Sequence, residues 1–570
     1  MSPPCRGVGG ELAPARRSVR TGVGGWRGAC PRAQIGPRWR GGLAGGLPPR
    51  ADRSALAWGV GGGLAPRLYS GPHWRGGLAG GSPPACTLVP FVSAISQESD
   101  AVSEPIQPPA DLLDRLVSLG KQRGFFFQSS EIYGGINALY DFGPLGTRIR
   151  RNIRSRWWRS IVELRDDVEG IESSIIMNPQ VWVASGHVAG FSDPLVDCTG
   201  SCRKRWREDH LAAERIARGK HPDAPGCPEC GGPLTGARQF NLMFRTFLGP
   251  VEDSSAQVYL RPETAQGMFV DFRSVLTSSR QRIPFGIAQN GKSFRNEISP
   301  GNSIFRMREF EMMELEFFCK PGTDEEWYDH WRSARFSWYT EELGIRRERL
   351  RLRDHDHEEL SHYAKAATDV EYLFPFGWGE LEGIANRTDF DLSAHQKASG
   401  ADLSYLDPVT GERYVPYVIE PSVGVDRIML IVLLDAYDEE MVRGEKRVVL
   451  RMHPDVAPVQ VAVLPLSKKE ELCVRARDLE HRLRPHFATE YDETQSIGRR
   501  YRRQDEIGTP LAVTVDFESL QDDAVTIRER DGMTQVRVPI SGLEEALRDQ
   551  LALFRQRTAA RACGAAPAGP

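Results

Sequence analysis

Residues 291–319 read GKSFRNEISPGNSIFRMREFEMMELEFFC and combine alternating apolar positions with dense charge. The alternation predicts two β-strands, residues 293–298 and 309–318, joined by a turn at Ser-Pro-Gly-Asn 299–302. On the first strand Arg295 and Glu297 share one face. The second strand places on one face Phe310, Met312, Glu314, Glu316 and Phe318.

The polar faces of this hairpin carry more charge than a half-buried hairpin needs. They hold Arg295, Glu297, Arg306, Arg308, Glu309, Glu314 and Glu316. Guanidinium groups suit a triphosphate, an aromatic ring suits a purine, and carboxylates suit an ammonium group. A salt-bridged sheet face is the alternative interpretation. The stretch therefore predicts a site for a multiply charged ligand.

The pattern Phe294-Arg295-Asn296-Glu297, a loop, and then Arg306-x-x-x-Phe310 resembles motif 2 of the class II aminoacyl-tRNA synthetases. The surrounding residues, over about 108–558, are similar to the glycyl-tRNA synthetase family. The resemblance implies an α+β catalytic domain at 106–450, built on an antiparallel sheet with flanking helices, and an α/β anticodon-binding domain at 457–558. It also implies a glycine–tRNA ligase that forms glycyl-adenylate from glycine and ATP and transfers glycine to the 3′ end of tRNA(Gly).

Two other functions fit the same resemblance. One is another class IIa synthetase, such as the prolyl or threonyl enzyme. The other is a non-catalytic, synthetase-like accessory protein that binds nucleic acid. The carboxylates of this chain argue against the first, and the presence of Arg295, Glu297 and Arg427 argues against the second.

The resemblance assigns roles to individual residues. It makes Arg295, Glu297 and Arg427 catalytic. It assigns ATP to Arg295, Asn296, Glu297, Phe305, Arg306, Met307, Arg308, Glu309, Phe310, Glu380, Leu381, Gly424, Val425, Asp426 and Arg427. It assigns glycine to Arg205, Glu263, Phe310, Glu311, Met312, Met313, Glu314, Glu420, Pro421, Ser422, Val423 and Gly424.

Two later segments support the ATP site. Glu380 and Glu382 are expected to share a strand face, where carboxylates near a triphosphate would hold Mg²⁺. Arg427 opens an apolar helix over 428–434, so its guanidinium would lie near a helix N-terminus. Paired acids on an exposed strand are the alternative for the first segment.

A helix beginning at Thr147, with Ile149, Ile153, Trp157 and Ile161 on one face, precedes a strand expected at 171–177. This resembles class II motif 1, which implies a homodimer. An ordinary core helix and strand fit as well.

Four cysteines, Cys198, Cys202, Cys227 and Cys230, fall within an insertion at 198–235. Their spacing favours a structural Zn²⁺ site with four thiolates over disulfides or free thiols.

Residues 324–372 are expected to be helical, with His355, His357 and His362 on the surface.

The C-terminal domain carries a basic segment at 498–510. Arg499, Arg500, Tyr501, Arg502 and Arg503 suit phosphate contact and base stacking on tRNA, or form the basic face of a helix.

The ends of the chain have the composition of disordered segments. Residues 1–90 contain 21 Gly and 12 Pro, too little apolar content to form a core. We expect disorder over 1–105 and 559–570. Residues 1–105 are interpreted as a start extended too far upstream, a basic RNA-binding arm, or a transit peptide. Without a signal peptide or a long apolar run, a cytoplasmic protein is expected.

Overall fold

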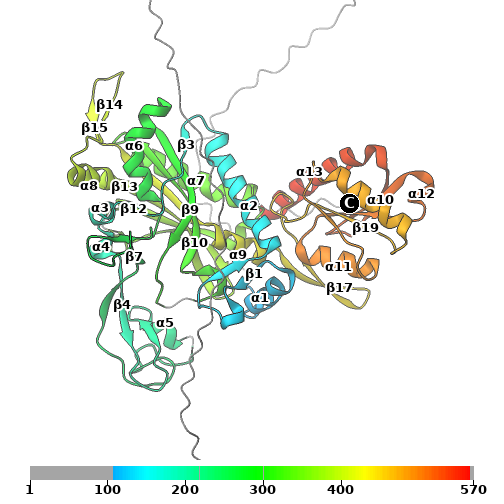
Figure 1. Ribbon diagram of the computed structural model, residues 1–570, viewed down its shortest axis with the longest axis horizontal. Helices are drawn as coiled ribbons and strands as arrows, with labels where there is room; N and C mark the ends of the chain where they lie inside the picture. The colour runs from blue at the N-terminus through cyan, green and yellow to red at the C-terminus, as the bar shows by residue number, and fades with distance from the viewer. Residues whose placement is uncertain (1–106, 217, 299–300, 362, 565–570) are drawn as a thin grey trace, which may run out of the picture. The chain divides into compact units, whose positions relative to one another are not determined.

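The computed structural model describes residues 107–564 except 217, 299, 300 and 362 (Figure 1). The predicted disorder over 1–105 lies outside the described residues, as do residues 565–570. The described residues belong to one compact unit, 97–570. Within them, no helix is long and apolar enough to traverse a lipid bilayer.

A seven-stranded sheet in the order β11-β12-β13-β16-β10-β9-β3 is the largest sheet among the described residues. Neighbouring strands are antiparallel except β3, which runs parallel to β9 at the edge. The strands are β3 Val168–Gly170, β9 Phe285–Phe294, β10 Glu309–Cys319, β11 Leu350–Asp354, β12 Ala366–Phe374, β13 Gly377–Thr388 and β16 Tyr417–Gly424. The antiparallel sheet expected from the resemblance is therefore confirmed.

Helices cover both faces of the sheet, and alternate apolar residues of β10 pack against them. Met313, Leu315 and Phe317 are fully buried in the main core, which α2 Pro144–Trp158, α7 Asp324–Glu341 and α9 Val425–Ala436 complete. On the opposite face, Phe318 packs with residues of α6 Ala265–Ser279 and α8 Phe390–Ser399. The same face, nearer the start of β10, is left to polar residues. Figure 1 shows β9 and β10 in the middle of this arrangement.

Three predicted elements differ from the structure. The first strand of the opening hairpin is β9, Phe285–Phe294, so residues 295–298 follow the strand as a loop instead of forming it. No strand forms over 171–177 beyond a single bridge at Ile176, because the pairing with β9 is made earlier, by β3. In 324–372 the α-helix α7 ends at Glu341, and the strands β11 and β12 follow it.

Helix α2 follows its prediction closely. Ile149, Ile153 and Trp157 are fully buried and Ile161 is nearly so, although the last turns, Arg159–Glu163, are π-helical. The helix starts at Pro144, where Gly146 packs against Phe125: a Cβ at Gly146 would lie 1.8 Å from the Phe125 carbonyl oxygen.

A small module is inserted between α4 His187–Gly190 and α6. It contains a three-stranded sheet in the order β5-β4-β6. Its elements are β4 Ser192–Asp197, β5 Arg205–Arg207, α5 Leu211–Ile216 and β6 Arg238–Asn241, and the hairpin β7 Arg245–Phe247 with β8 Gln257–Tyr259 leads back to the core. Short elements elsewhere are α1 Leu112–Arg123, β1 Phe126–Gln128, β2 Tyr140–Phe142, α3 Pro179–Ala184, β14 Tyr405–Leu406, β15 Arg413–Tyr414, β17 Tyr437–Val442 and β18 Glu445–Leu450.

The C-terminal part is the expected α/β domain, with a five-stranded sheet in the order β20-β19-β21-β22-β23. Its elements are β19 Val461–Pro465, α10 Glu470–Leu483, β20 Thr489–Tyr491, α11 Ile497–Ile507, β21 Leu511–Val515, α12 Ser519–Asp522, β22 Ala524–Glu529, β23 Gln535–Pro539 and α13 Leu543–Ala562. Helix α13 runs beyond residue 559, so the start of the predicted disordered tail is instead helical.

A β-bulge in β13 separates the two acids that were expected to share a face. Glu371 pairs with Glu380, whereas Val370 pairs with Glu382, so Leu381 is an extra residue. Glu382 is fully buried against α7. There it accepts hydrogen bonds from Arg335 Nε at 2.6 Å and Tyr339 Oη at 2.5 Å. The prediction of paired acids is therefore wrong for Glu382, which has a structural role.

Replacing Arg335 with Met should reduce the free energy of unfolding by about 3–5 kcal/mol, because it leaves the buried Glu382 carboxylate without its cation. Arg332 on the same helix provides the control: it pairs at 2.8 Å with Asp354, whose side chain is 67% exposed. Arg332→Met should cost about 1 kcal/mol or less. Urea unfolding measures both, and equal effects would contradict the structural role of Glu382.

Candidate active site

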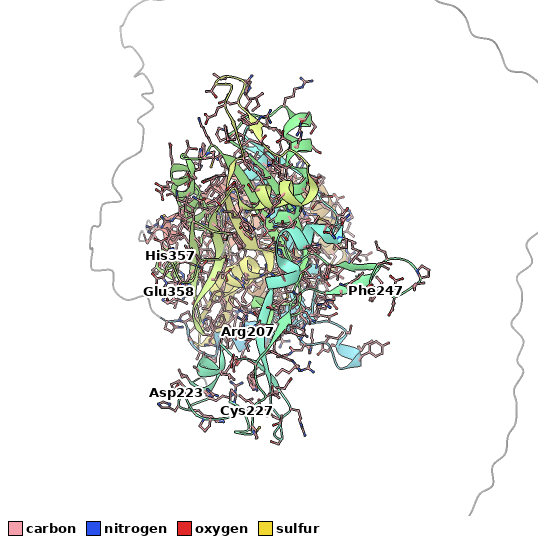
Figure 2. All side chains as sticks on the ribbon, turned by 90° about the vertical axis from the view of Figure 1, so that its left-hand side faces the viewer. Arg207, Asp223, Cys227, Phe247, His357 and Glu358 are labelled. Atoms are coloured by element: carbon pink, nitrogen blue, oxygen red, sulfur yellow. The ribbon has the colours of Figure 1, made fainter. Side chains whose placement is uncertain are left out.

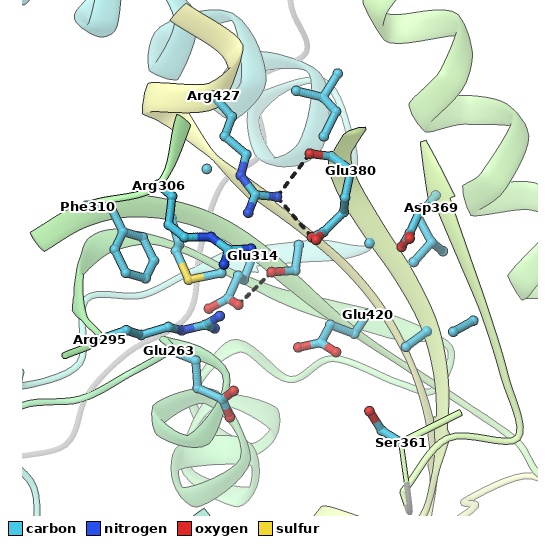
Figure 3. A pocket seen from close by; sticks show the side chains of 18 of the residues that line it. Glu263, Arg295, Arg306, Phe310, Glu314, Ser361, Asp369, Glu380, Glu420 and Arg427 are labelled. Atoms are coloured by element: carbon cyan, nitrogen blue, oxygen red, sulfur yellow. Dashed lines mark hydrogen bonds and ion pairs between the residues drawn. The ribbon is translucent and has the colours of Figure 1, made fainter. Parts of the chain in front are cut away.

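A cavity of about 270 Å³ opens on the polar face of the sheet, over β10, β13 and β16 (Figure 3). Glu263, just before α6, the loop before β10, and the residues His355, Glu359, Ser361, Tyr363 and Ala364 also line it. It brings together these predicted site residues: Glu263, Arg295, Glu297, Phe305, Arg306, Met307, Phe310, Met312, Glu314, Glu380, Leu381, Glu420, Ser422, Gly424, Asp426 and Arg427. The hairpin, the segment at 259–267 and the start of α9 thus converge on one site.

One end of the cavity is built from carboxylates. Glu314 is almost completely buried and accepts hydrogen bonds from the Thr264 backbone N–H at 2.6 Å, from the Thr264 hydroxyl, and from Ser422 Oγ at 2.7 Å. The Thr264 side chain therefore serves Glu314 and does not cap α6. These three donors fix the position of the Glu314 carboxyl group.

Two more carboxylates face the same space. Burial alone would raise the pKa of Glu263, but His187, Arg387 and Gln266 together lower it below its usual range. Burial, with the charges of Glu314 and Glu263, raises the pKa of Glu420 to about 7, although Arg387 opposes the shift. The three acids therefore crowd negative charge around a small volume, which suits a compact cation.

The other end is aromatic and cationic. Arg295 Nε donates to the Pro262 carbonyl at 3.1 Å, and its guanidinium lies 5.4 Å from the centroid of the Phe310 ring. Arg427, in the first turn of α9, lies 4.7 Å from the ring of Phe305. Figure 3 shows Arg306, Phe310 and Arg427 at this end of the cavity. A planar base and phosphates fit this end.

Acids lie beside this cationic end. Arg427 Nη1 pairs with Glu380 Oε1 at 3.1 Å, and the charge of Arg427 is the largest cause of the lowered pKa of Glu380. Burial, followed by the nearby charge of Glu380, raises the pKa of Asp369. Two carboxylates beside a cationic end provide the oxygen ligands that Mg²⁺ prefers.

Several residues that line the cavity were missed or misjudged. Asp369 was assigned to a helical connection, although the alternation of 366–374 could have indicated a strand. His355 was predicted to lie on the surface, yet it lines the cavity, with Nε2 2.8 Å from Asp369 Oδ2. His357 is exposed as expected, and His362 lies outside the described residues. Arg387 also lines the cavity, although the residues around it in the sequence did not indicate a role for it.

Other predicted residues do not line the cavity. Alternation turns some of them to the opposite face of the sheet: Glu311, Met313, Pro421 and Val423. Glu311 binds Arg150 at 2.8 Å and Arg154 at 2.6 Å. Asn296, Glu309 and Val425 are also outside the lining, and Glu309 pairs with Lys292 at 2.9 Å.

Two arginines expected at the site are bound elsewhere. Arg308 donates to the backbone carbonyls of Glu297 at 2.9 Å and Asn137 at 2.8 Å, so it holds the loop before β10. Arg205 pairs with Asp197 at 3.2 Å while its side chain is 69% exposed. The structure therefore does not bring either residue to the cavity.

The four cysteines of the insertion meet at one point. Cys198 Sγ lies 3.5 Å from Cys230 Sγ, and Cys202 Sγ lies 3.5 Å from Cys227 Sγ; all four sulfurs lie within 4.8 Å of one another. Tetrahedral thiolates with Zn–S bonds of about 2.3 Å would be about 3.8 Å apart. Figure 2 shows Cys227 and Asp223 at the far end of the insertion. The cluster therefore fits a zinc ion.

The basic segment forms α11, and its five predicted residues separate. Arg500 is buried and donates to the carbonyls of Glu493 and Gln495, both at 2.7 Å, so it is not available to RNA. Arg503 pairs with Asp492, and Tyr501 Oη lies 2.5 Å from Thr514 Oγ1. Arg499 is exposed and Arg502 is half-buried.

Two family models match the chain. Residues 249–436 match the "tRNA synthetase class II core domain (G, H, P, S and T)". Residues 460–550 match the "Anticodon binding domain". The first range includes Glu263, Glu314, Glu420 and Arg427, and the second includes α11.

Two solved structures have a similar fold. They are prolyl-tRNA synthetases from Cryptosporidium parvum, one in complex with L-proline and AMP and the other with halofuginone and AMPPNP. The first has a TM-score of 0.56 at 15% identity, covering 80% of this chain and 78% of that one. The second has a TM-score of 0.55 at 16% identity, covering 79% and 77%. At such identity the likeness shows the fold alone.

Curated relatives are much more similar in sequence. The glycine–tRNA ligase of Caldanaerobacter subterraneus subsp. tengcongensis is 56% identical over 457 residues, covering 77% of this chain and 98% of the relative. That of Thermobifida fusca is 54% identical over 458 residues, covering 78% and 99%. Because nearly the whole length of these relatives is matched, the chain belongs to the glycine–tRNA ligase family of class II tRNA synthetases.

Proposed function

We propose that the cavity binds glycine and ATP, forms glycyl-adenylate, and transfers glycine to the 3′ end of tRNA(Gly). The observation that supports this most directly is the division of the cavity into a carboxylate end and a cationic, aromatic end. Family membership supports the same activity.

At the glycine end, Glu263, Glu314 and Glu420 would bind the ammonium group. Glycine has no side chain, so the site must recognise its charges and exclude larger amino acids by lack of space. Ser422, held by its hydrogen bond to Glu314, would close the wall. Glu314 lies four residues from Phe310 along β10, about 13 Å at about 3.3 Å per residue. This separation suits an aminoacyl-adenylate, whose amino group lies far from its base.

At the ATP end, Phe310 and Arg427 would hold adenine between them. Arg295 would contact the α-phosphate, where negative charge develops as pyrophosphate leaves, and Arg306 would contact the outer phosphates. Glu297, also in the cavity, would help to hold the nucleotide. Because Arg308 is bound to backbone carbonyls, we assign it to holding this loop.

Glu380 and Asp369 would hold Mg²⁺, which neutralises phosphate charge when it is bound. The other contributions come from positioning and from fixed charges, and neither step requires a covalent enzyme intermediate. The terminal ribose hydroxyl of tRNA would then attack the glycyl carbonyl and displace AMP.

We also propose that Arg499 and Arg502 contact tRNA, since they are the members of the basic segment whose charges remain accessible. The chain would form a homodimer through the surface around α2, where Ile175 and Ile176 are exposed next to a cavity lined by Arg151, Arg154 and Glu172.

We also propose that the protein is located in the cytoplasm, as expected from the sequence.

The assignment predicts ATP–pyrophosphate exchange with glycine and negligible exchange with alanine, because an added methyl group would collide with a closed wall. Glu314→Gln should lose about 2–3 kcal/mol of transition-state binding, the scale of one charge-assisted hydrogen bond, with KM for ATP nearly unchanged. Exchange driven by proline or threonine would contradict the glycine assignment.

Glu316 gives a matched control two residues further along the same face. It is fully buried and neither carboxyl oxygen has a hydrogen-bond partner among the described residues. Burial, followed by the charge of Glu420, raises the pKa of Glu316 well above its usual value, although Arg387 opposes this. The folded state therefore binds a proton that the unfolded state releases above about pH 4.3, so this group lowers stability as pH rises.

Glu316→Gln should remove that pH dependence while leaving glycine exchange close to wild type. The gain in Tm over wild type should be larger at pH 8 than at pH 5, measured by calorimetry. An equal gain at both values of pH would show that Glu316 is not protonated in the folded protein.

We propose that the four cysteines bind one structural Zn²⁺. Purified protein should carry about one equivalent per chain by metal analysis, and Cys227→Ser should reduce it, because three thiolates leave the shell open. Cys319→Ser, at a buried cysteine in β10 outside the cluster, should leave the zinc content unchanged. Protein purified without chelator that carries no metal would contradict the site.

A further inference from the structure

Gln266, in the first turn of α6, lies directly behind the carboxylate end of the cavity. Its side chain is fully buried. The amide Nε2 donates to Glu263 Oε1 and to Asp391 Oδ1, both at 3.0 Å. One amide group therefore joins a carboxylate of the cavity to a buried carboxylate of α8.

The surroundings of Gln266 fix the orientation of its amide. Reversing it would place Oε1 against two carboxylates, whereas the present orientation gives each of them a hydrogen. Oε1 lies 2.8 Å from His395 Nε2, so His395 must donate from Nε2. Burial lowers the pKa of His395, which favours a neutral ring with its single N–H on this side.

The network reaches a second cavity acid through Arg387. Its guanidinium binds Asp391 with Nε at 2.8 Å and Nη2 at 3.0 Å, and binds Glu420 Oε2 with Nη1 at 2.8 Å. All of these side chains are more than nine-tenths buried. Glu263 and Glu420 are thus connected by Gln266, Asp391 and Arg387, without a solvent-exposed link.

The remaining oxygen of Glu263 is held from another element. His187 of α4 places Nε2 3.3 Å from Glu263 Oε2, while its Nδ1 lies 2.8 Å from Ser185 Oγ. Both oxygens of Glu263 are therefore held by neighbouring side chains.

We propose that Gln266 is a positioning residue for glycine, which sets the orientation of Glu263 directly and of Glu420 through Asp391 and Arg387. The inference rests on the proposed function of the cavity. Without the amide, Glu263 and Asp391 would face each other as unbridged buried carboxylates, and they would rotate apart or take up a proton. Either change weakens the grip on the ammonium group and leaves the ATP end intact.

A role in packing alone predicts a different order of variants. Glu has nearly the same shape as Gln, so a packing role would tolerate Gln266→Glu better than Gln266→Met. Positioning by hydrogen bonds predicts the reverse, because Glu would add a third carboxylate between two others, whereas Met fills the space without charge.

The test is the KM for glycine and for ATP in ATP–pyrophosphate exchange. Gln266→Met should raise KM for glycine about tenfold or more and leave KM for ATP within twofold, and Gln266→Glu should lower kcat/KM for glycine further. Gln396→Met is the matched control: Gln396 is half-buried on α8 and binds the Leu403 N–H, outside the network, so its kinetics should match wild type.

His395→Leu gives a second test if the Gln266 variants fail to fold. It removes only the donor to Gln266 Oε1, so it should raise KM for glycine severalfold from a residue that does not line the cavity. The inference is overturned if a folded Gln266→Met or His395→Leu protein keeps the wild-type KM for glycine, or if Gln266→Glu is the milder variant. Absence of glycine exchange in wild-type protein would instead overturn the proposed function.

Discussion

The central constraint in this structure is that β10, an interior strand of a seven-stranded sheet, must be apolar on one face and charged on the other. Met313, Leu315 and Phe317 anchor the core beneath α2, α7 and α9. Each intervening residue is then forced onto the opposite face, where Phe310, Met312 and Glu314 line the cavity. A shift of one residue in register would bury Glu314 in the core and expose Leu315. The fold and the site therefore depend on the same alternation.

Carboxylates in such a buried position must be stabilised individually, because each would otherwise take up a proton. Glu314 is stabilised by the Thr264 N–H and hydroxyl, and Glu420 by Arg387. Glu316 has no donor among the described residues, and its pKa is raised. Acids on one face of β10 thus differ in the hydrogen-bond donors that they receive.

The sequence predicted these features where a local pattern determined them. The strict alternation of 309–318 indicated β10 and its polar face, and the spacing of Ile149, Ile153 and Trp157 indicated α2. Patterns of contiguous residues were less reliable for the site, because a strand delivers only every second side chain to a cavity. Glu311 and Val423 were included with their neighbours for this reason and lie on the core side. The bulge that separates Glu380 from Glu382 has no local signal, since it depends on pairing with β12.

Long side chains were the other source of error, because their destination depends on tertiary partners. Arg308, Arg500 and Arg205 each fit a ligand-binding pattern, yet the first two bind backbone carbonyls and the third binds an aspartate on β4. Conversely, the role of Arg387 is indicated only by its contacts with Asp391 and Glu420 in the structure.

The same dependence on tertiary contacts links the cysteine-bearing insertion to the cavity. Asn241, at the end of β6, donates to the carbonyls of His187 at 3.0 Å and Val188 at 3.2 Å, and His187 in turn faces Glu263. The base of the insertion therefore supports the part of the cavity wall that carries Glu263. An insertion that carries its own cluster of four cysteines is, at this point, part of the framework that positions Glu263.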